Sequence, residues 1–428
     1  MTEATYFPQV RVANRDSPFD GQTVALAVVD GTIEINPAAP PANATVVEFD
    51  GLHVSPGWAD FGAALHEPGH EHKETLDSLL AAAQAGGYTH VTAFPETEPV
   101  VDDATALKGL LALAPDDLGV GLGIIGALSK GQSGEQLAVT GEMADAGVGF
   151  VGDGLRAVED PKLLQLALTY AQAFGVAVVT QPGERRLEGA GQMHEGEVST
   201  ALGLPGLAAM TEEIGVARDL RLREYTGGRL HFHALTLAAT LEAAAFAKTQ
   251  SASVSYGVPV LNLLLTDQAL DDYDATAKVL PPLREAPDRD ALHSAIFTGA
   301  ADVLVSNHRP HDTEESRVEF PYAAFGAATL ELAFAIAATA TDAATAADYL
   351  GRRNRAFCGL APATIEDGAR AELTLFLPEA TFEVPERPLR SLGINVPLVG
   401  RKLTGVPAGT FADSRWRPSP WLATLSLG

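Results

Sequence analysis

The sequence predicts a (β/α)8 barrel of the TIM type, with a smaller composite β-sandwich domain formed by both chain termini. In the middle of the chain, short apolar strands alternate with amphipathic helices. Strand-rich segments without helices flank this alternation on both sides. Eight strand–helix units fit one barrel, and two β-rich ends are explained most simply by one shared domain. The 428 residues, 46% of them hydrophobic, are enough to bury one large core and a smaller one.

The β-sandwich domain is expected to combine residues 1–50 with residues 365–428. Alternating apolar and polar residues and bordering turn residues mark its strands. They are predicted at residues 6–12, 23–29, 32–35, 45–51, 371–376 and 400–406. The Asp30-Gly31 pair is a typical hairpin turn between the second and third strands.

The barrel is expected over residues 51–364. Its eight strands are predicted at residues 52–62, 90–95, 120–125, 148–151, 176–180, 230–234, 253–258 and 303–306. Helices are expected at residues 76–86 and 343–355. The apolar residues 323–338 suggest a further helix whose face favours a homo-oligomer. Functional side chains of such a barrel lie at the C-terminal ends of its strands.

The composition excludes several classes of protein. The formal net charge of -26 argues against a nucleic-acid-binding protein and against binding to an anionic membrane. Such acidity suits a high-salt cytoplasm or a basic partner, and composition does not separate the two. No apolar run is long enough to span a membrane, and residues 1–4 do not resemble a signal peptide. We therefore expect a cytoplasmic protein, in which the single cysteine, Cys358, is an apolar filler in a helix.

A series of spaced motifs runs through the barrel in a fixed order. It comprises Pro56-Gly57, Asp60, Glu67-Pro68-Gly69, Glu71-His72-Lys73-Glu74, Asp153-Gly154, His194-Glu195-Gly196-Glu197, Pro281-Pro282-Leu283-Arg284 and Asn307-His308-Arg309-Pro310-His311. The series resembles the class I dihydroorotases of the amidohydrolase superfamily over nearly the whole chain. The resemblance implies a barrel enzyme of pyrimidine biosynthesis that hydrolyses a cyclic amide at a zinc site.

Most metal-ligand positions implied by the resemblance hold other residue types. The family's His-x-His pair falls on Gly62 and Ala64, its two later histidines fall on Gln181 and Ala234, and its last-strand aspartate, the acid/base, falls on Asn307. Only Asp153 keeps a carboxylate, and one carboxylate before Gly154 is better explained as a turn residue. We therefore predict neither a metal nor another cofactor.

The substrate positions implied by the resemblance have changed as well. The family arginine falls on His66, and its two asparagines fall on Glu96 and Pro259. A carboxylate at position 96 would repel an anionic substrate. His308 and His311 beside the last strand fit an anion-binding role and a packing role equally well.

Two other histidine pairs are candidates for a relocated metal site. His70 and His72 have His-x-His spacing, but they lie where a helix begins and are expected at the surface. His231 and His233 share one face of a strand, opposite to Ala234, so they are expected in the core and directed away from the site.

Three hypotheses follow for the function. The first is a metal-free, inactive dihydroorotase-like pseudoenzyme that acts as a structural or regulatory partner; family analogy suggests aspartate carbamoyltransferase. The alternative is an active cyclic amidohydrolase with zinc in a rearranged site. A third is a small-ligand sensor built from pocket residues His66, Glu96, Gln181, Asn307 and His308.

Overall fold

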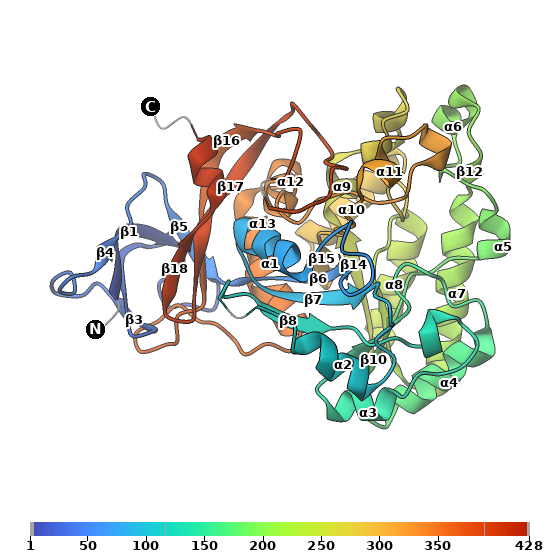
Figure 1. Cartoon of the computed structure of the whole chain (residues 1–428), viewed down its shortest axis with the longest axis horizontal. Coiled ribbons are helices and arrows are strands. Elements are labelled where there is room, and N and C mark those ends of the chain that lie inside the picture. Colours follow the sequence, from blue (N-terminus) through green and yellow to red (C-terminus); the bar gives the residue numbers. More distant parts are fainter. Residues whose placement is uncertain (1–3, 116, 389, 426–428) are drawn as a thin grey trace.

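The predicted barrel is confirmed. The computed structural model describes residues 4–115, 117–388 and 390–425, so the outermost residues of the predicted terminal domain lie outside the described part. Eight parallel strands surround the core of the larger part of the molecule (Figure 1). They are β6 (Trp58–Leu65), β7 (Tyr88–Pro95), β8 (Gly121–Ile124), β9 (Phe150–Val151), β10 (Ala177–Thr180), β13 (Arg229–Phe232), β14 (Val254–Pro259) and β15 (Val303–Val305).

Two sets of backbone contacts close the barrel. The strands pair in two runs, β6-β7-β8 and β9-β10-β13-β14-β15. A parallel bridge between Gly126 and Val151 joins the ends of β8 and β9. The Ala64 N–H donates to the carbonyl of His308 over 2.9 Å, which joins β6 to the residues after β15. The C-terminal ends of all eight strands therefore meet at one mouth.

Helices cover the outside of the barrel (Figure 1). The predicted helix at 76–86 is α1 (Leu76–Ala85), and it begins at Thr75 because Thr75 and Ser78 form a capping box. The other helices of the outer layer are α2 (Ala104–Leu111), α3 (Thr140–Asp145), α4 (Pro161–Gln172), α7 (Ala209–Thr226), α8 (Ala238–Gln250) and α10 (Ala286–Phe297). The described helices include none with the length and apolar composition that a membrane span requires.

Short elements occupy the loops at the mouth. They are α5 (Arg185–Glu188), β11 (Met193–His194), α6 (Glu197–Leu202), β12 (Gly206–Leu207), α9 (Val260–Leu264) and α11 (Thr313–Ser316). After the barrel, α13 (Ala343–Asp348) continues through a π-helical turn, Tyr349–Arg353, into α14 (Asn354–Phe357). This run matches the helix predicted at 343–355. Cys358 follows it, half-buried, and burial raises the pKa of its thiol to about 12.

The prediction of a helix over residues 323–338 is wrong for the first half of that range. α12 covers only Ala333–Ala340, because residues 323–329 are not helical: Ala327 bridges to His308, and Gly326 donates to the carbonyl of Lys278. Residues 333–338 are buried and pack against β17 (Lys402–Ala412). This apolar face is therefore covered by the chain itself and gives no support to a homo-oligomer, which remains a prediction.

Both chain ends contribute to one terminal β-domain, as predicted, and its strands pair into a single eight-stranded sheet (Figure 1). Its strands are β1 (Ala4–Val12), β2 (Thr23–Val29), β3 (Thr32–Ile35), β4 (Thr45–Val46), β5 (His53–Pro56), β16 (Leu373–Glu383), β17 and β18 (Arg415–Pro418). The strand expected at 52–62 is in fact two strands, with β5 in this sheet and β6 in the barrel. The chain changes sheet at Gly57, where a Cβ atom would lie 2.3 Å from Oγ1 of Thr89.

Candidate functional site

The imidazole of His233 occupies the space beside Gly62 at the barrel mouth. Gly62 has a φ of 91°, at a point where β6 and β7 change register. A Cβ atom at Gly62 would lie 2.1 Å from Cε1 of His233. The position of the family's first histidine therefore has no room for a side chain while His233 keeps its place. Ala64, the second position, is fully buried and contributes no donor side chain.

The prediction that His231 and His233 point away from the site is wrong. Both rings lie against Phe61 in the barrel interior, with ring centroids 5.3 Å and 6.2 Å away. The prediction assumed that side chains alternate between the two faces of the strand as far as Ala234. β13 ends at Phe232, so this alternation does not apply to Ala234. Both residues are nevertheless fully buried, as expected for core histidines, and Nδ1 of His231 lies 2.9 Å from Oγ of Ser255.

The remaining positions of the implied zinc site do meet at the mouth. The Gln181 side chain donates through Nε2 to the carbonyl of Ala234 over 3.0 Å, and Asn307 donates through Nδ2 to the carbonyl of Leu280 over 3.1 Å. Pro259 ends β14 and precedes α9. The sequence thus identified positions that lie together, although few of their side chains carry a metal donor.

Arg309 and Glu96 form an ion pair across the mouth. Nη1 of Arg309 contacts Oε1 of Glu96, and their side chains are 7% and 31% exposed. Burial alone would raise the pKa of the Glu96 carboxyl, but Arg309 and His66 outweigh it and lower that pKa to about 2. The charge of Glu96, expected to repel a substrate, is therefore compensated within the protein. The sequence shows both charged residues, but nothing in it indicates that they pair.

His66 lies beside this ion pair and is 2% exposed. Burial lowers the pKa of its imidazole to about 3, Glu96 opposes this shift, and Arg309 adds to it. Burial also lowers the pKa of His233 to about 3, again with a contribution from Arg309 and with partial compensation by Asn307. Both imidazoles are consequently neutral at physiological pH, and the positive charge of Arg309 contributes to the lowered pKa of each.

The two histidines near the last strand are engaged by protein groups. Nδ1 of His308 accepts from the N–H groups of Thr329 (3.1 Å) and Leu330 (3.2 Å), and its Nε2 lies 3.4 Å from Oε2 of Glu74. Nδ1 of His311 lies 2.6 Å from Oε2 of Glu315, and its Nε2 lies 3.0 Å from the carbonyl of Phe325. These contacts favour the packing interpretation over anion binding.

Asp153, in the loop after β9, forms hydrogen bonds with the loop after β8. Its Oδ1 accepts from the N–H groups of Leu128 (2.9 Å) and Ser129 (3.0 Å), and its Oδ2 accepts from Oγ of Ser129 (2.5 Å). Burial raises the pKa of Asp153, and these hydrogen bonds oppose the shift. All its strong contacts are with the loop after β8, which agrees with a structural role.

The side chains at the mouth do not fit a zinc ion. Zinc sites use thiolate, imidazole or carboxylate donors at about 2.0–2.3 Å in a tetrahedral arrangement. Gly62, Ala64 and Ala234 have no donor side chain, and the amides of Gln181 and Asn307 are poor replacements. In the part of the chain that the structure describes, no three His, Cys, Asp or Glu side chains gather as a metal site would require. His70 and His72 lie in the turn before α1, with ring centroids 6.0 Å apart.

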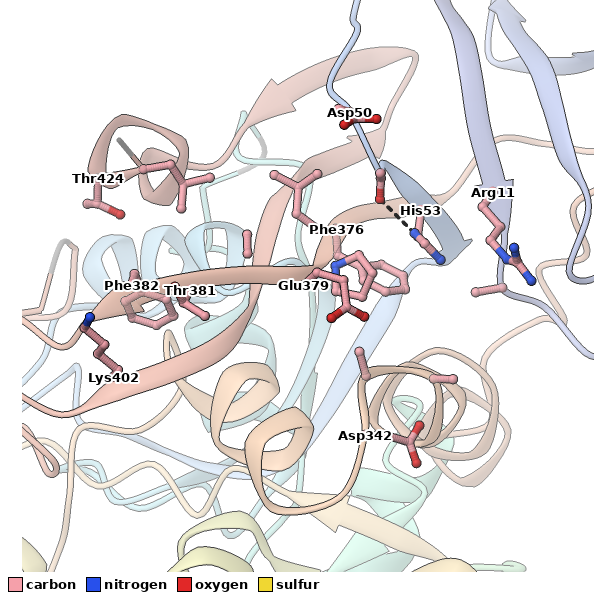
Figure 2. A pocket seen from close by; sticks show the side chains of 18 of the residues that line it. Arg11, Asp50, His53, Asp342, Phe376, Glu379, Thr381, Phe382, Lys402 and Thr424 are labelled. Atoms are coloured by element: carbon pink, nitrogen blue, oxygen red, sulfur yellow. Dashed lines mark hydrogen bonds between the residues drawn. The ribbon is translucent and has the colours of Figure 1, made fainter. Parts of the chain in front are cut away.

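A large groove lies elsewhere, between the terminal sheet and α13, and has a volume of about 1080 Å³. Figure 2 shows His53 over the ring of Phe376, with Glu379 beside them and Asp342 on the opposite wall. Nδ1 of His53 is 2.9 Å from the carbonyl of Gly51, and its ring centroid is 5.4 Å from that of Phe376. Acidic and basic residues both line this groove, but it contains none of the predicted site residues.

A second buried polar network adjoins the mouth. Arg284 donates through Nη2 to Oε2 of Glu212 over 3.0 Å and through Nε to Oγ1 of Thr236 over 3.0 Å, and its Nη1 lies 3.0 Å from Nδ1 of His194. Arg284 and Glu212 are 4% and 3% exposed. This network fixes the loop after β14 against α7 and borders a smaller cavity of about 210 Å³ that Gln181 also lines.

Known proteins resemble this chain in both fold and sequence. A family profile described as dihydro-orotase-like matches residues 51–242. The chain is 34% identical to a dihydroorotase of Geotalea daltonii over 92% of this chain and 94% of that one, and 36% identical to a dihydroorotase of Pelotomaculum thermopropionicum over 91% and 92%. It superposes on an L-hydantoinase (dihydropyrimidinase) of Arthrobacter aurescens with a TM-score of 0.83 at 19% identity, over 97% and 96% of the two chains. The chain therefore belongs to the dihydroorotase family of the amidohydrolase superfamily, as a divergent member that lacks most of the family's metal-ligating side chains.

Proposed function

We propose that this protein is a metal-free, catalytically inactive dihydroorotase-like protein of pyrimidine biosynthesis that acts as a structural or regulatory partner. Its metabolic context rests on the relatives, which are named dihydroorotases. Aspartate carbamoyltransferase is the first partner to test, by family analogy alone.

One observation carries this proposal: His233 occupies the space beside Gly62 where the family's first metal ligand would stand. A single missing ligand could be replaced by a neighbour. Here the ligand positions on β6, β10 and β13 are changed together, and the Arg309–Glu96 pair lies across the same mouth. A metal-activated water would have no set of ligands to hold its metal.

The alternative is an active cyclic amidohydrolase with a rearranged site. The observation that favours it is the identity of 34% or more to relatives named dihydroorotase over about nine-tenths of the chain. Such an enzyme would need a new acid/base in place of Asn307, and His66 and His233 are buried imidazoles at the mouth. Zinc would be its expected cofactor.

An activity assay separates the two hypotheses. The purified chain would be incubated with dihydroorotate and, separately, with its ring-opened product, in buffers containing either zinc or a chelator. We expect no rate above the uncatalysed reaction in either buffer. Turnover that the chelator abolishes would establish the alternative.

The partner role has its own test. Purified aspartate carbamoyltransferase from the same organism would be mixed with this chain and followed by size-exclusion chromatography with light scattering. Coelution at a defined stoichiometry, with a change in the transferase's assembly or activity, supports the proposal. Separate elution at micromolar concentrations would remove this partner.

A further inference from the structure

Helix α4 is apolar on both its inner and its outer face. The inner face packs on β10 and β13 and is formed by buried Leu163, Leu164, Ala167, Leu168 and Ala171. The outer face presents Leu166, Tyr170 and Phe174 at intervals of four residues, and they are 43%, 42% and 41% exposed. We call these three residues the α4 ridge. A helix that is hydrophobic all round is normally buried on all sides, so the α4 ridge is a candidate contact surface.

Neighbouring groups order the aromatic part of the α4 ridge. The rings of Tyr170 and Phe174 meet edge to face, with their centroids 5.2 Å apart. Gly141 of α3 leaves room for both rings, because a Cβ atom there would lie 2.7 Å from Cζ of Phe174 and 3.2 Å from Oη of Tyr170. Side chains that are already ordered lose little conformational entropy when a partner covers them, which favours binding.

The segment that contains the α4 ridge carries no charge. From Leu163 to Gly183 the sequence has no Asp, Glu, Lys, Arg or His, although charged residues make up 20% of the chain. Two copies with a formal net charge of -26 each repel one another, and the repulsion is weakest where the approaching surfaces are uncharged. A basic partner would instead favour the acidic surfaces elsewhere on the molecule.

Charges of opposite sign border the α4 ridge. On one side, α3 exposes Glu142 and Asp145. On the other side, the exposed Arg229 begins β13 and donates to the carbonyl of Gly175, just after α4, over 2.9 Å. A twofold axis along α4 would bring the α3 side of one copy opposite the β13 side of the other. Acidic residues of each copy would then face an arginine of its partner.

We propose that two copies of this chain form a symmetric dimer through the α4 ridge. The 12 residues of α4 give a helix about 18 Å long. A stable interface buries about 800 Å² of each partner, so the bordering residues of α3 and β13 take part as well. Self-association is independent of the proposed function. A monomeric chain would leave the missing zinc ligands as they are, and bound zinc would leave the α4 ridge as it is.

Sedimentation velocity of the full chain at increasing micromolar concentrations tests the dimer, in salt high enough to screen the net charge. We expect a reversible rise from the mass of one chain to the mass of two. In Tyr170→Glu the dissociation constant should rise roughly tenfold or more, because each copy would bring a carboxylate into the centre of the contact. Leu166→Lys, one turn away on the same face, should have a similar effect.

Phe246→Glu is the matched control. It places the same new charge on an aromatic residue of α8 that is 67% exposed, and it should dimerise as the unaltered chain does. Circular dichroism would check that each variant folds, and Leu166→Lys decides alone if Tyr170→Glu does not.

Three results would overturn the proposal. The first is the mass of one chain at every concentration. The second is an unchanged dissociation constant in the variants of the α4 ridge. The third is a dimer that Phe246→Glu disrupts while those variants leave it intact, which would place the contact on α8.

Discussion

The imidazole of His233 lies so close to Gly62 that a Cβ atom on the glycine would be 2.1 Å from Cε1. Gly62 lies in β6 and His233 directly follows β13, and these two strands are not neighbours in the barrel. Their contact therefore crosses the barrel interior and fills the mouth from within. A side chain at position 62 and the buried ring of His233 therefore cannot occupy this space together.

The first prediction concerns Gly62→Ala. Alanine at a φ of 91° is strained, and its methyl group would overlap His233. We expect the free energy of unfolding to fall by about 2–4 kcal/mol, which combines the backbone strain with overpacking. Denaturant titration measures it.

Gly109→Ala is the control for this substitution. Gly109 lies in α2 with no atom within 4 Å of an added Cβ, so alanine there should be neutral or stabilising. In a His233→Ala background the overlap disappears, and the penalty of Gly62→Ala should fall to about 1–2 kcal/mol. An equal penalty in both backgrounds would contradict the contact.

The second prediction concerns Glu96→Gln. This change leaves the buried guanidinium of Arg309 without its carboxylate. Because the Glu96 side chain is 31% exposed, we expect a loss of about 1–3 kcal/mol in unfolding free energy, less than for a fully buried pair. The exposed Glu379→Gln should change it by less than about 0.5 kcal/mol. A loss no larger than this control would show that the pair contributes little.

The third prediction concerns pH. The folded-state pKa values of His66 and His233 are lowered to about 3, below the value of about 6.5 in an unfolded chain. Below pH 6.5 the unfolded chain therefore binds more protons, so stability is complete above that pH and falls as the pH decreases toward 3. Each histidine contributes at most about 1.4 kcal/mol per pH unit.

Replacing one of these histidines measures how much it contributes to the pH dependence of the unfolding free energy. The slope of unfolding free energy against pH measures how many more protons the unfolded chain binds than the folded chain. Between pH 6 and 4, His233→Phe should lower this difference by about one proton. The exposed His72→Gln is the matched control and should leave more of the slope intact. An unchanged slope in His233→Phe would mean that His233 is not buried as a neutral ring.

The barrel was predictable from sequence because its signal is repeated. Each short apolar strand is followed by a helical stretch, and eight repetitions define one fold even when single boundaries are inaccurate. The terminal sheet was predictable because apolar and polar residues alternate at both ends of the chain. The break at Gly57 was not predictable, because it depends on the side chain of Thr89 in another strand.

The candidate site was only partly predictable. Family resemblance located Gln181, Ala234 and Asn307, and these positions do converge at the mouth. His233 points into the barrel because β13 ends just before it. The alternation of side chains along a predicted strand does not reveal where the strand ends. Glu96 and Arg309 are 213 residues apart and pair only because the barrel closes. The sequence shows the two charges but not their contact.

The most direct test of the central claim is the zinc content of the protein. The chain would be produced in zinc-supplemented medium, purified without chelator, dialysed, and analysed by mass spectrometry of the metal, with a zinc-containing dihydroorotase treated identically. The lack of ligands at Gly62, Ala64, Gln181 and Ala234 predicts far less than one zinc per chain. Near-stoichiometric zinc, with a melting temperature that falls when a chelator is added, would contradict the account.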